Sequence, residues 1–475
     1  MGQEITLTQF EESDFIVFRQ KLAQETALLK QMIERKSCSN QQPTAGFEIE
    51  AWLVDRAMRP APVNQQYLAT LHNPLASAEL AKFNFELNCE PVPLTGNVLT
   101  RLHAQLDRIW QNASRHAESM NHSTLMIGIL PTLTQGDLHL GNMSDMHRYQ
   151  ALNTQILQTR NTPIHIDISG AEHLKIDHHD VMLEAATTSF QTHIQLPLDL
   201  AHHFYNASII ASAAMVAISA NSPFLFGKEL WHETRIPLFE QAVEAGGYAG
   251  AARGPLHRVG FGSGYLRHSV NECFAENLAH FPVLLPVNLD THIEMFAHLR
   301  LHNGTIWRWN RPLVGFDPDG TPHIRIEHRT PASGPTPLDA IANAAFYYGL
   351  ARNICEQAMR HGLPLDFSVA KDNFYQAARH GLDSTITWFD GSRHRMDHLL
   401  RTELLPRAAK GLQSFGVNTA DIDAYLDIIR QRLANKQNGS AWQRRYAKAH
   451  HRDFTEMTRS YLKNQKTGKP VSEWP

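Results

Sequence analysis

Glutamates are two residues apart in the segment GFEIEAWLV and four residues apart in the segment FNFELNCEP. Alternate side chains of an extended strand lie on one face, so Glu48 and Glu50 would share a face of the first segment. Glu86 and, if the strand continues, Glu90 would share a face of the second. Carboxylates crowded on one face repel each other unless cations neutralise them, and hard oxygen ligands favour Mg²⁺ or Mn²⁺. The spacing therefore predicts a site for divalent metal ions.

Two later segments continue this pattern with other side chains. SFQTHIQLP places His193 between two glutamines at the same spacing, and HIRIEHRTP places Glu327 between Arg325 and Arg329. An imidazole is compatible with Mg²⁺ and shifts the preference slightly towards Mn²⁺. The forked guanidinium donors of arginine suit phosphate oxygens. Together the four segments predict a polyphosphate and metal site on one face of a sheet.

A simpler interpretation of each segment is an amphipathic strand with one face in water, which explains any one of them alone. A solvated face should be rich in Lys, Thr and Ser, whereas these positions hold carboxylates, a histidine, arginines and carboxamides but no lysine. The chain also lacks a GxxxxGK[ST] motif, and its RVGFGSGY stretch has no following helix signal. A nucleoside triphosphate would therefore be bound without a phosphate-binding glycine loop.

Helical and strand patterns alternate irregularly over the first two thirds of the chain. Apolar residues at helical spacing predict helices over residues 13–36 and 207–220, and a third helix after Gly96. Strand signals lie at 46–54, 83–88, 124–130, 164–168, 190–196, 305–310 and 323–330. This order predicts an α+β fold whose mostly antiparallel sheet is flanked by helices.

After about residue 337 the periodicity is helical and the strand signals disappear. We therefore expect a catalytic core over residues 1–350 and a helical C-terminal layer over residues 351–475 that packs on this core. The polar tail from Lys463 is expected to be extended.

The composition of this 475-residue chain favours small-molecule partners. Its 44 Lys and Arg against 47 Asp and Glu give a net charge of −3, so charge does not favour nucleic acid or an anionic membrane. The four cysteines lie far apart without a CxxC spacing, which fits a reducing cytoplasm. The longest apolar stretch, SIIASAAMVAISA, is shorter than the roughly 20 residues that span a bilayer. The oligomeric state cannot be read from the sequence.

Five of these segments occur in the order and context of a known family: GFEIEAWLVD, FNFELNCEP, SFQTHIQLP, ANSPFLFG and RIEHRTP. The chain resembles glutamate–cysteine ligase family 2 over roughly residues 44–350, and NFYQAARHGLDSTI and NGSAWQRRY resemble its bacterial carboxylate–amine ligase branch. The resemblance implies a glutamine-synthetase-like catalytic sheet curved into a funnel. It also implies ATP and two to three Mg²⁺ or Mn²⁺ ions that bridge ATP and an amino-acid carboxylate.

Site residues follow from the resemblance position by position. It implies metal ligands at Glu48, Glu50, Glu86, His193 and Glu327, with Glu90 a further candidate because family members differ in carboxylate spacing on that strand. Arg329 resembles the family's phosphate-contacting arginine, and Arg325 is a second candidate; both are also the expected catalytic residues. Arg235 and Arg258 are alternative candidates for the arginine that binds the substrate carboxylate, and the resemblance does not choose between them. Tyr265 is a further substrate-binding candidate.

The resemblance implies a glutamate–cysteine ligase that acts in glutathione biosynthesis and forms a γ-glutamyl amide through an acyl phosphate. One alternative keeps this chemistry and joins glutamate or another carboxylate to a different amine. A second is a catalytically silent regulator that binds metal or nucleotide, although all five of the family's metal ligands are present. A third is phosphotransfer to a guanidino or carboxylate group, which would need no amine.

Overall fold

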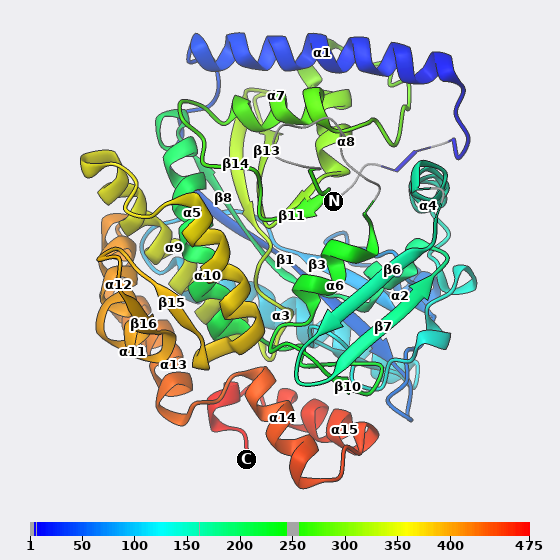
Figure 1. Cartoon of the computed structure of the whole chain (residues 1–475), viewed down its shortest axis with the longest axis vertical. Coiled ribbons are helices and arrows are strands. Elements are labelled where there is room, and N and C mark those ends of the chain that lie inside the picture. Colours follow the sequence, from blue (N-terminus) through cyan, green and yellow to red (C-terminus); the bar gives the residue numbers. More distant parts are fainter. Residues whose placement is uncertain (1–3, 6, 161, 245–255) are drawn as a thin grey trace.

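An eight-stranded sheet lies at the centre of the molecule, with helices on both sides (Figure 1). The computed structural model describes residues 4–5, 7–160, 162–244 and 256–475. Six strands follow the order β13-β14-β8-β1-β3-β2, while β4 and β5 also pair with β1, and all these pairs are antiparallel. The predicted α+β fold with a mostly antiparallel sheet is confirmed. The strands are β1 (Thr44–Val54), β2 (Ala76–Ala78), β3 (Asn84–Asn88), β4 (Val92–Pro93), β5 (Ser123–Leu125), β8 (Phe190–Leu196), β13 (Asn310–Phe316) and β14 (Pro322–His328).

The register of the sheet brings the alternating polar residues into one region. Glu50 of β1 lies opposite Glu86 of β3, and Glu327 of β14 lies opposite His193 of β8. Since alternate residues share a face, the intervening apolar side chains of these strands point to the other side. The core forms there, because Ile49, Phe85, Ile194 and Ile326 are all fully buried.

Two helices cover this apolar face, α5 (Leu198–Ser219) and α9 (Pro337–His361). Helix α5 is longer than the helix expected from its small residues, and every residue from Phe204 to Ser219 is buried. The ring of Tyr347 on α9 stacks on His328 of β14 at a centroid distance of 4.0 Å. The Tyr348 hydroxyl donates to the backbone oxygens of Gly46 and His193, so α9 supports the strands that carry the polar face.

Helix α9 also packs against α12 (Leu405–Ser414) at a glycine crossing. A Cβ atom at Gly349 would lie 2.1 Å from the backbone oxygen of Ala408, which no side chain tolerates. The two helices approach this closely because both positions of the crossing, Gly349 and Gly411, lack a side chain.

A separate layer at the top of Figure 1 contains α1 (Glu12–Glu34), α7 (Asn271–His280) and α8 (Ala297–Gly304). Helix α1 is amphipathic as expected, and its Phe18, Leu22 and Leu29 are buried. Its Glu25 carboxylate bonds to the His298 ring at 2.6 Å and accepts from the Leu299 backbone N–H at 2.7 Å. This buried pair fixes the first helix to α8.

The remaining elements surround this framework. They are α2 (Asn64–Leu71), α3 (Val98–Ser119), α4 (His147–Arg160), β6 (Ile164–Ser169), β7 (His173–His178), β9 (Phe224–Leu225), β10 (Lys228–Glu229), α6 (Arg235–Ala242), β11 (Val259–Gly260), β12 (Trp307–Arg308), α10 (Phe367–His380), β15 (Thr385–Thr387), β16 (Arg393–Arg395), α11 (Met396–Leu399), α13 (Thr419–Asn435), α14 (Gly439–Ala449) and α15 (Phe454–Gln465). Among the described residues, no helix combines the length and apolar character needed to cross a bilayer.

Several expected elements differ in the structure. The strand expected at 124–130 ends at Leu125, and the strand expected at 164–168 forms a separate hairpin of β6 and β7. The strand signal at 305–310 is divided between β12 and β13. Past residue 337, the short hairpin of β15 and β16 contradicts the expectation of helices alone.

The C-terminal segment also differs from the expected extended tail. Val471 and Trp474 are buried, and the Val471 backbone N–H donates to the Asp339 carboxylate of α9 at 2.9 Å. Long-range packing of two apolar side chains therefore decides the path of a segment whose own sequence is polar. Helix α9 itself runs through residue 350 without a break.

Candidate active site

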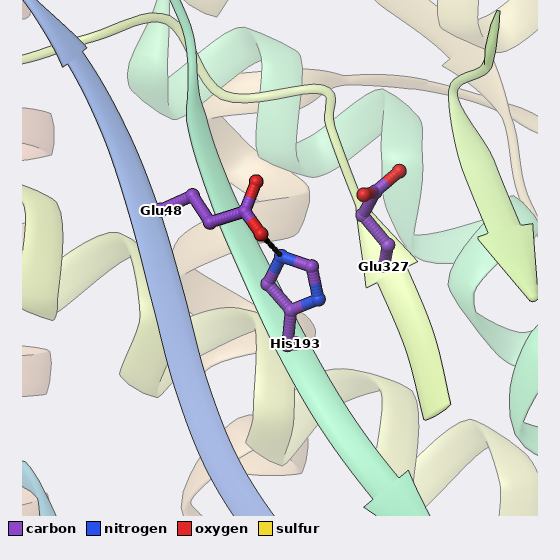
Figure 2. A group of neighbouring side chains, drawn as sticks. All are labelled: Glu48, His193 and Glu327. Atoms are coloured by element: carbon purple, nitrogen blue, oxygen red, sulfur yellow. Dashed lines mark ion pairs between the residues drawn. The ribbon is translucent and has the colours of Figure 1, made fainter. Parts of the chain in front are cut away.

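The first acidic cluster consists of Glu48, His193 and Glu327, which come from three adjacent strands (Figure 2). One potential ligand atom from each residue lies within 4.8 Å of the others. His193 Nε2 lies 3.3 Å from a Glu48 oxygen, and Nδ1 is buried without a hydrogen-bond partner in the described chain. Two carboxylates and an imidazole in this arrangement suit a divalent cation such as Mg²⁺ or Mn²⁺.

The second acidic cluster consists of Glu50, Glu79 and Glu86, whose ligand atoms also lie within 4.8 Å of one another. The Glu50 carboxylate accepts from the Ser189 backbone N–H at 2.6 Å and from the Gln191 amide at 2.9 Å. Glu86 accepts from the Asn88 amide at 2.8 Å. Three carboxylates held this closely form a hard oxygen donor set for a second cation.

Glu79 was missed from the sequence. It directly follows the three-residue strand β2, where Ser77 lies opposite Glu86, and so it reaches the cluster from the loop between β2 and β3. A strand of this length has no measurable alternation, and the segment LASAELAK holds only one acidic residue. The only available signal was its position a few residues before FNFELNCEP.

Two arginines hold the Glu327 carboxylate of the first cluster. Arg311, on β13, donates from Nε to Glu327 Oε2 at 2.8 Å and from Nη2 to Oε1 at 3.0 Å. Arg329 Nη1 donates to Glu327 Oε2 at 3.3 Å and to the Gln191 amide oxygen at 2.5 Å. Burial opposes ionisation, yet Arg311 and Arg329 together lower the pKa of Glu327 to about 2.

Carboxyl groups in and beside the second cluster have the opposite shift. Burial first, and then the charge of Glu48, raise the pKa of Glu86 to about 7. Burial and the neighbouring Glu86 raise the pKa of Glu79. Glu184, in the short 3₁₀ helix Val181–Ala186 before β8, has its pKa raised to about 8 by burial and by Glu50. These acids face one another in a low-dielectric setting, which disfavours their charged forms unless a cation binds.

The sequence matches a known family over most of its length. The family model described as glutamate-cysteine ligase family 2 matches residues 44–465. The chain belongs to glutamate–cysteine ligase family 2. Because the match continues past residue 350, the C-terminal helices up to α15 are part of the family's common region.

The solved structures that align with this chain have distant sequences. A glutamate–cysteine ligase from Francisella tularensis in complex with AMP aligns with a TM-score of 0.56 at 12% identity, over 90% of each chain. A bifunctional glutathione synthetase from Pasteurella multocida aligns with a TM-score of 0.48 at 10% identity, over 95% of this chain and 55% of that one. No curated protein matches the sequence. Membership of glutamate–cysteine ligase family 2 makes the chain an enzyme, a ligase of the carboxylate–amine class.

The structure separates the two arginines that were candidates for the substrate carboxylate. Arg235 begins α6, contacts Glu233 at 3.3 Å and donates to the backbone oxygens of Arg329 and Thr330, just past β14. Arg258 is buried elsewhere and donates to the Thr305 backbone oxygen at 3.0 Å and to that of Pro282. Arg235 therefore borders the strand end that carries Arg329, whereas Arg258 contacts neither acidic cluster.

Three other predicted site residues have different surroundings. Arg325 lies on the same strand face as Glu327, and its Nε is buried without a hydrogen-bond partner in the described chain. Glu90 has an exposed side chain and lies outside both clusters. Tyr265 packs edge-on against Phe367 and lines a cavity of ≈ 510 Å³ formed by the starts of α5 and α10 and the end of α9.

Proposed function

We propose that this family member is an ATP-dependent glutamate–cysteine ligase, which joins the γ-carboxylate of glutamate to the amine of cysteine. The observation that carries the proposal is the pair of acidic clusters side by side on one sheet face, with Arg329 next to the first. Family membership supports the choice of substrates, and the product would serve glutathione biosynthesis. The Francisella ligase with the same fold was solved with AMP, which supports an adenine nucleotide as co-substrate.

The chemistry explains why such a site needs cations. A carboxylate is a poor electrophile at neutral pH, so ATP must first convert it into an acyl phosphate. The γ-carboxylate oxygen attacks the γ-phosphorus in line and ADP leaves; the amine nitrogen then attacks the acyl carbon and phosphate leaves, with the amine proton lost to solvent or a base. Negative charge accumulates on phosphate oxygens in the first step and on the former carbonyl oxygen in the second.

Different residues of the chain would bind the metal ions and the phosphate groups. Glu48, His193 and Glu327 would hold one divalent ion, and the second cluster another, which accounts for two of the two to three expected ions. When bound, Mg²⁺ or Mn²⁺ would neutralise phosphate oxygens and polarise the transferred group. Arg329 would place its guanidinium at the γ-phosphate, and Arg325 would add a second one along the same strand face.

The substrate side of the site is assigned to Arg235. Its bonds to the backbone just past β14 place it beside Arg329, and its guanidinium lies 5.2 Å from the ring centroid of Trp309. We assign it either a direct contact with a substrate carboxylate or support of the strand end that carries Arg329. Arg258, with its separate set of backbone contacts, has a structural role in this proposal.

The test measures ADP formation by the purified protein with ATP, Mg²⁺ or Mn²⁺ and glutamate while the amine acceptor is varied. We expect ADP only when both glutamate and an amine are present, with cysteine the fastest acceptor, and a γ-glutamyl amide identified by mass spectrometry. Faster turnover with another amine would change the acceptor and keep the ligase class. Phosphorylated product without an amine would indicate phosphotransfer, and no turnover with any acceptor would indicate a regulator.

A further inference from the structure

A buried arginine outside the predicted ligand set holds Glu327 in one orientation. Arg311 of β13 lies directly opposite Glu327 of β14 in the sheet register. Its Nε and Nη2 each donate to a different oxygen of the carboxylate, at 2.8 and 3.0 Å. The Arg311 side chain is 9% exposed and that of Glu327 is 2% exposed, so water competes little for this fork. A bidentate guanidinium–carboxylate pair fixes both the position and the plane of the carboxylate.

Arg311 is itself anchored from the helical layer above the sheet. Its third nitrogen, Nη1, donates to the backbone oxygens of Asn303 and Ile306 at 3.3 and 3.4 Å. The Asn303 side chain in turn donates to the backbone oxygen of Pro312, the neighbour of Arg311 on β13, at 3.0 Å. The guanidinium is thus held between the end of α8 and the sheet, and all three of its nitrogens have partners.

The hydrogen bonds leave the two oxygens of Glu327 in different states. Oε2 accepts from Arg311 Nε and from Arg329 Nη1, which uses both of its lone pairs. Oε1 accepts only from Arg311 Nη2 and keeps one lone pair. A carboxylate held in this way can offer one oxygen to a metal ion and cannot chelate it with both.

We propose that Arg311 is a positioning residue for the metal site of the first cluster: its fork holds Glu327 as a one-oxygen ligand directed at Glu48 and His193. This inference rests on the proposed metal-dependent function. It assigns the role to fork geometry, because a lysine at this position keeps the charge but offers a point donor on a flexible stem.

Manganese binding to the metal-free protein tests the proposal without relying on turnover. Free Mn²⁺ is measured by electron paramagnetic resonance in titrations of the wild type, Arg311→Lys and Arg311→Gln. Loss of a residue that orients a ligand typically weakens metal binding by about 10- to 100-fold, and we expect about tenfold weaker binding at one of two sites in both variants. The matched control is Arg432→Lys, because Arg432 forms a buried ion pair with Asp339 at 2.8 Å among the helices.

The outcomes separate this inference from the proposed function. Weaker Mn²⁺ binding in both Arg311 variants, with wild-type binding in Arg432→Lys, supports the positioning role. Wild-type binding in Arg311→Lys overturns it, because charge alone would then suffice. An equal loss of binding in Arg432→Lys also overturns it, because general destabilisation would explain the effect. Absence of Mn²⁺ binding in the wild type would instead refute the metal sites of the proposed function.

A second readout compares the metal concentration that gives half-maximal turnover with KM for the amine. We expect both Arg311 variants to raise the metal concentration that gives half-maximal turnover by about tenfold, as binding does, while KM for the amine stays near the wild-type value. A rise in the amine KM without a change in the metal requirement would place Arg311 at the acceptor and overturn its assignment to the metal site.

Discussion

The two acidic clusters have similar donor atoms but opposite electrostatic surroundings. Two arginines lower the pKa of Glu327 to about 2, so the first cluster contains a permanently ionised carboxylate. The second cluster is held by a backbone N–H and side-chain amides, and its Glu86 has a pKa raised to about 7. The first cluster is therefore ready to bind a cation at any physiological pH, whereas the second becomes fully charged only when a cation replaces its protons.

The largest effect on kcat is expected when one candidate ligand is removed from either cluster. Glu48→Gln and Glu50→Gln should each lower kcat by on the order of 100- to 1000-fold, since each deletes a ligand that stabilises charge in the transition state. Steady-state ADP release measures kcat, and circular dichroism checks that the variants remain folded. Wild-type activity in either folded variant would contradict the metal assignment of that cluster.

The second prediction concerns the stability of the metal-free protein, where the clusters should respond in opposite directions. Glu327→Gln leaves the buried Arg311 without its carboxylate and should lower the free energy of unfolding by about 3 kcal/mol. Glu86→Gln removes a carboxylate whose ionisation is unfavourable and should raise it by about 1 kcal/mol at pH 8. Urea unfolding in the presence of a chelator measures both. An equal decrease in the free energy of unfolding for the two variants would contradict the difference in electrostatic surroundings between the clusters.

The third prediction is a pH dependence that belongs to the second cluster. Glu86 has a folded-state pKa of about 7, above its ordinary value of 4.5, so folding takes up a proton between these values. Its contribution to stability is fully present below about pH 4.5 and is lost as the pH rises through about 7. Glu184, with a folded-state pKa of about 8, extends this loss to higher pH.

Thermal unfolding between pH 6 and 8.5 measures this effect. The Tm of the metal-free protein should fall as the pH rises, and the increase in Tm on adding Mg²⁺ should grow over the same range. The Glu86→Gln variant provides the control, because its Tm should depend less on pH. A metal-induced shift that is constant with pH would contradict the difference between the clusters.

The smallest expected effect comes from a glutamate that the strand pattern grouped with the ligands. Glu90 has an exposed side chain outside both clusters, so Glu90→Gln should keep kcat within about twofold of the wild type, as surface substitutions away from a site usually do. The Glu86→Gln variant, on the same segment, is the comparison for Glu90→Gln and should lose turnover. A large loss in Glu90→Gln would extend the metal site beyond the end of β3.

The sequence predicted the candidate metal ligands that lie within strands of five or more residues. Period-two alternation placed Glu48, Glu50, Glu86, His193 and Glu327 on one face, and the register of β1, β3, β8 and β14 brings them together. These positions were predictable because a strand with one buried face has little freedom to slip, since a one-residue shift would expose its apolar side chains.

Other parts of the site depend on contacts that no local pattern encodes. Glu79 reaches its cluster from the loop after β2. Arg311 lies on a strand that contains a proline, Pro312, which argues against strand structure. Strand β13 is an end strand in the sheet order, where a missing N–H is tolerated. Sequence alone could not give the pairing that brings Arg311 opposite Glu327.

The bond between Glu25 and α8 links the outermost helix to the proposed metal site. Glu25 on α1 holds His298 and Leu299, and the following turn of α8 leads to Asn303, whose backbone oxygen receives Arg311. Three hydrogen-bonded contacts and one turn of α8 thus separate a surface helix from the carboxylate of Glu327. An engineered, shortened enzyme that keeps only the sheet and the helices behind it would therefore lose the outer support of Glu327, a proposed metal ligand.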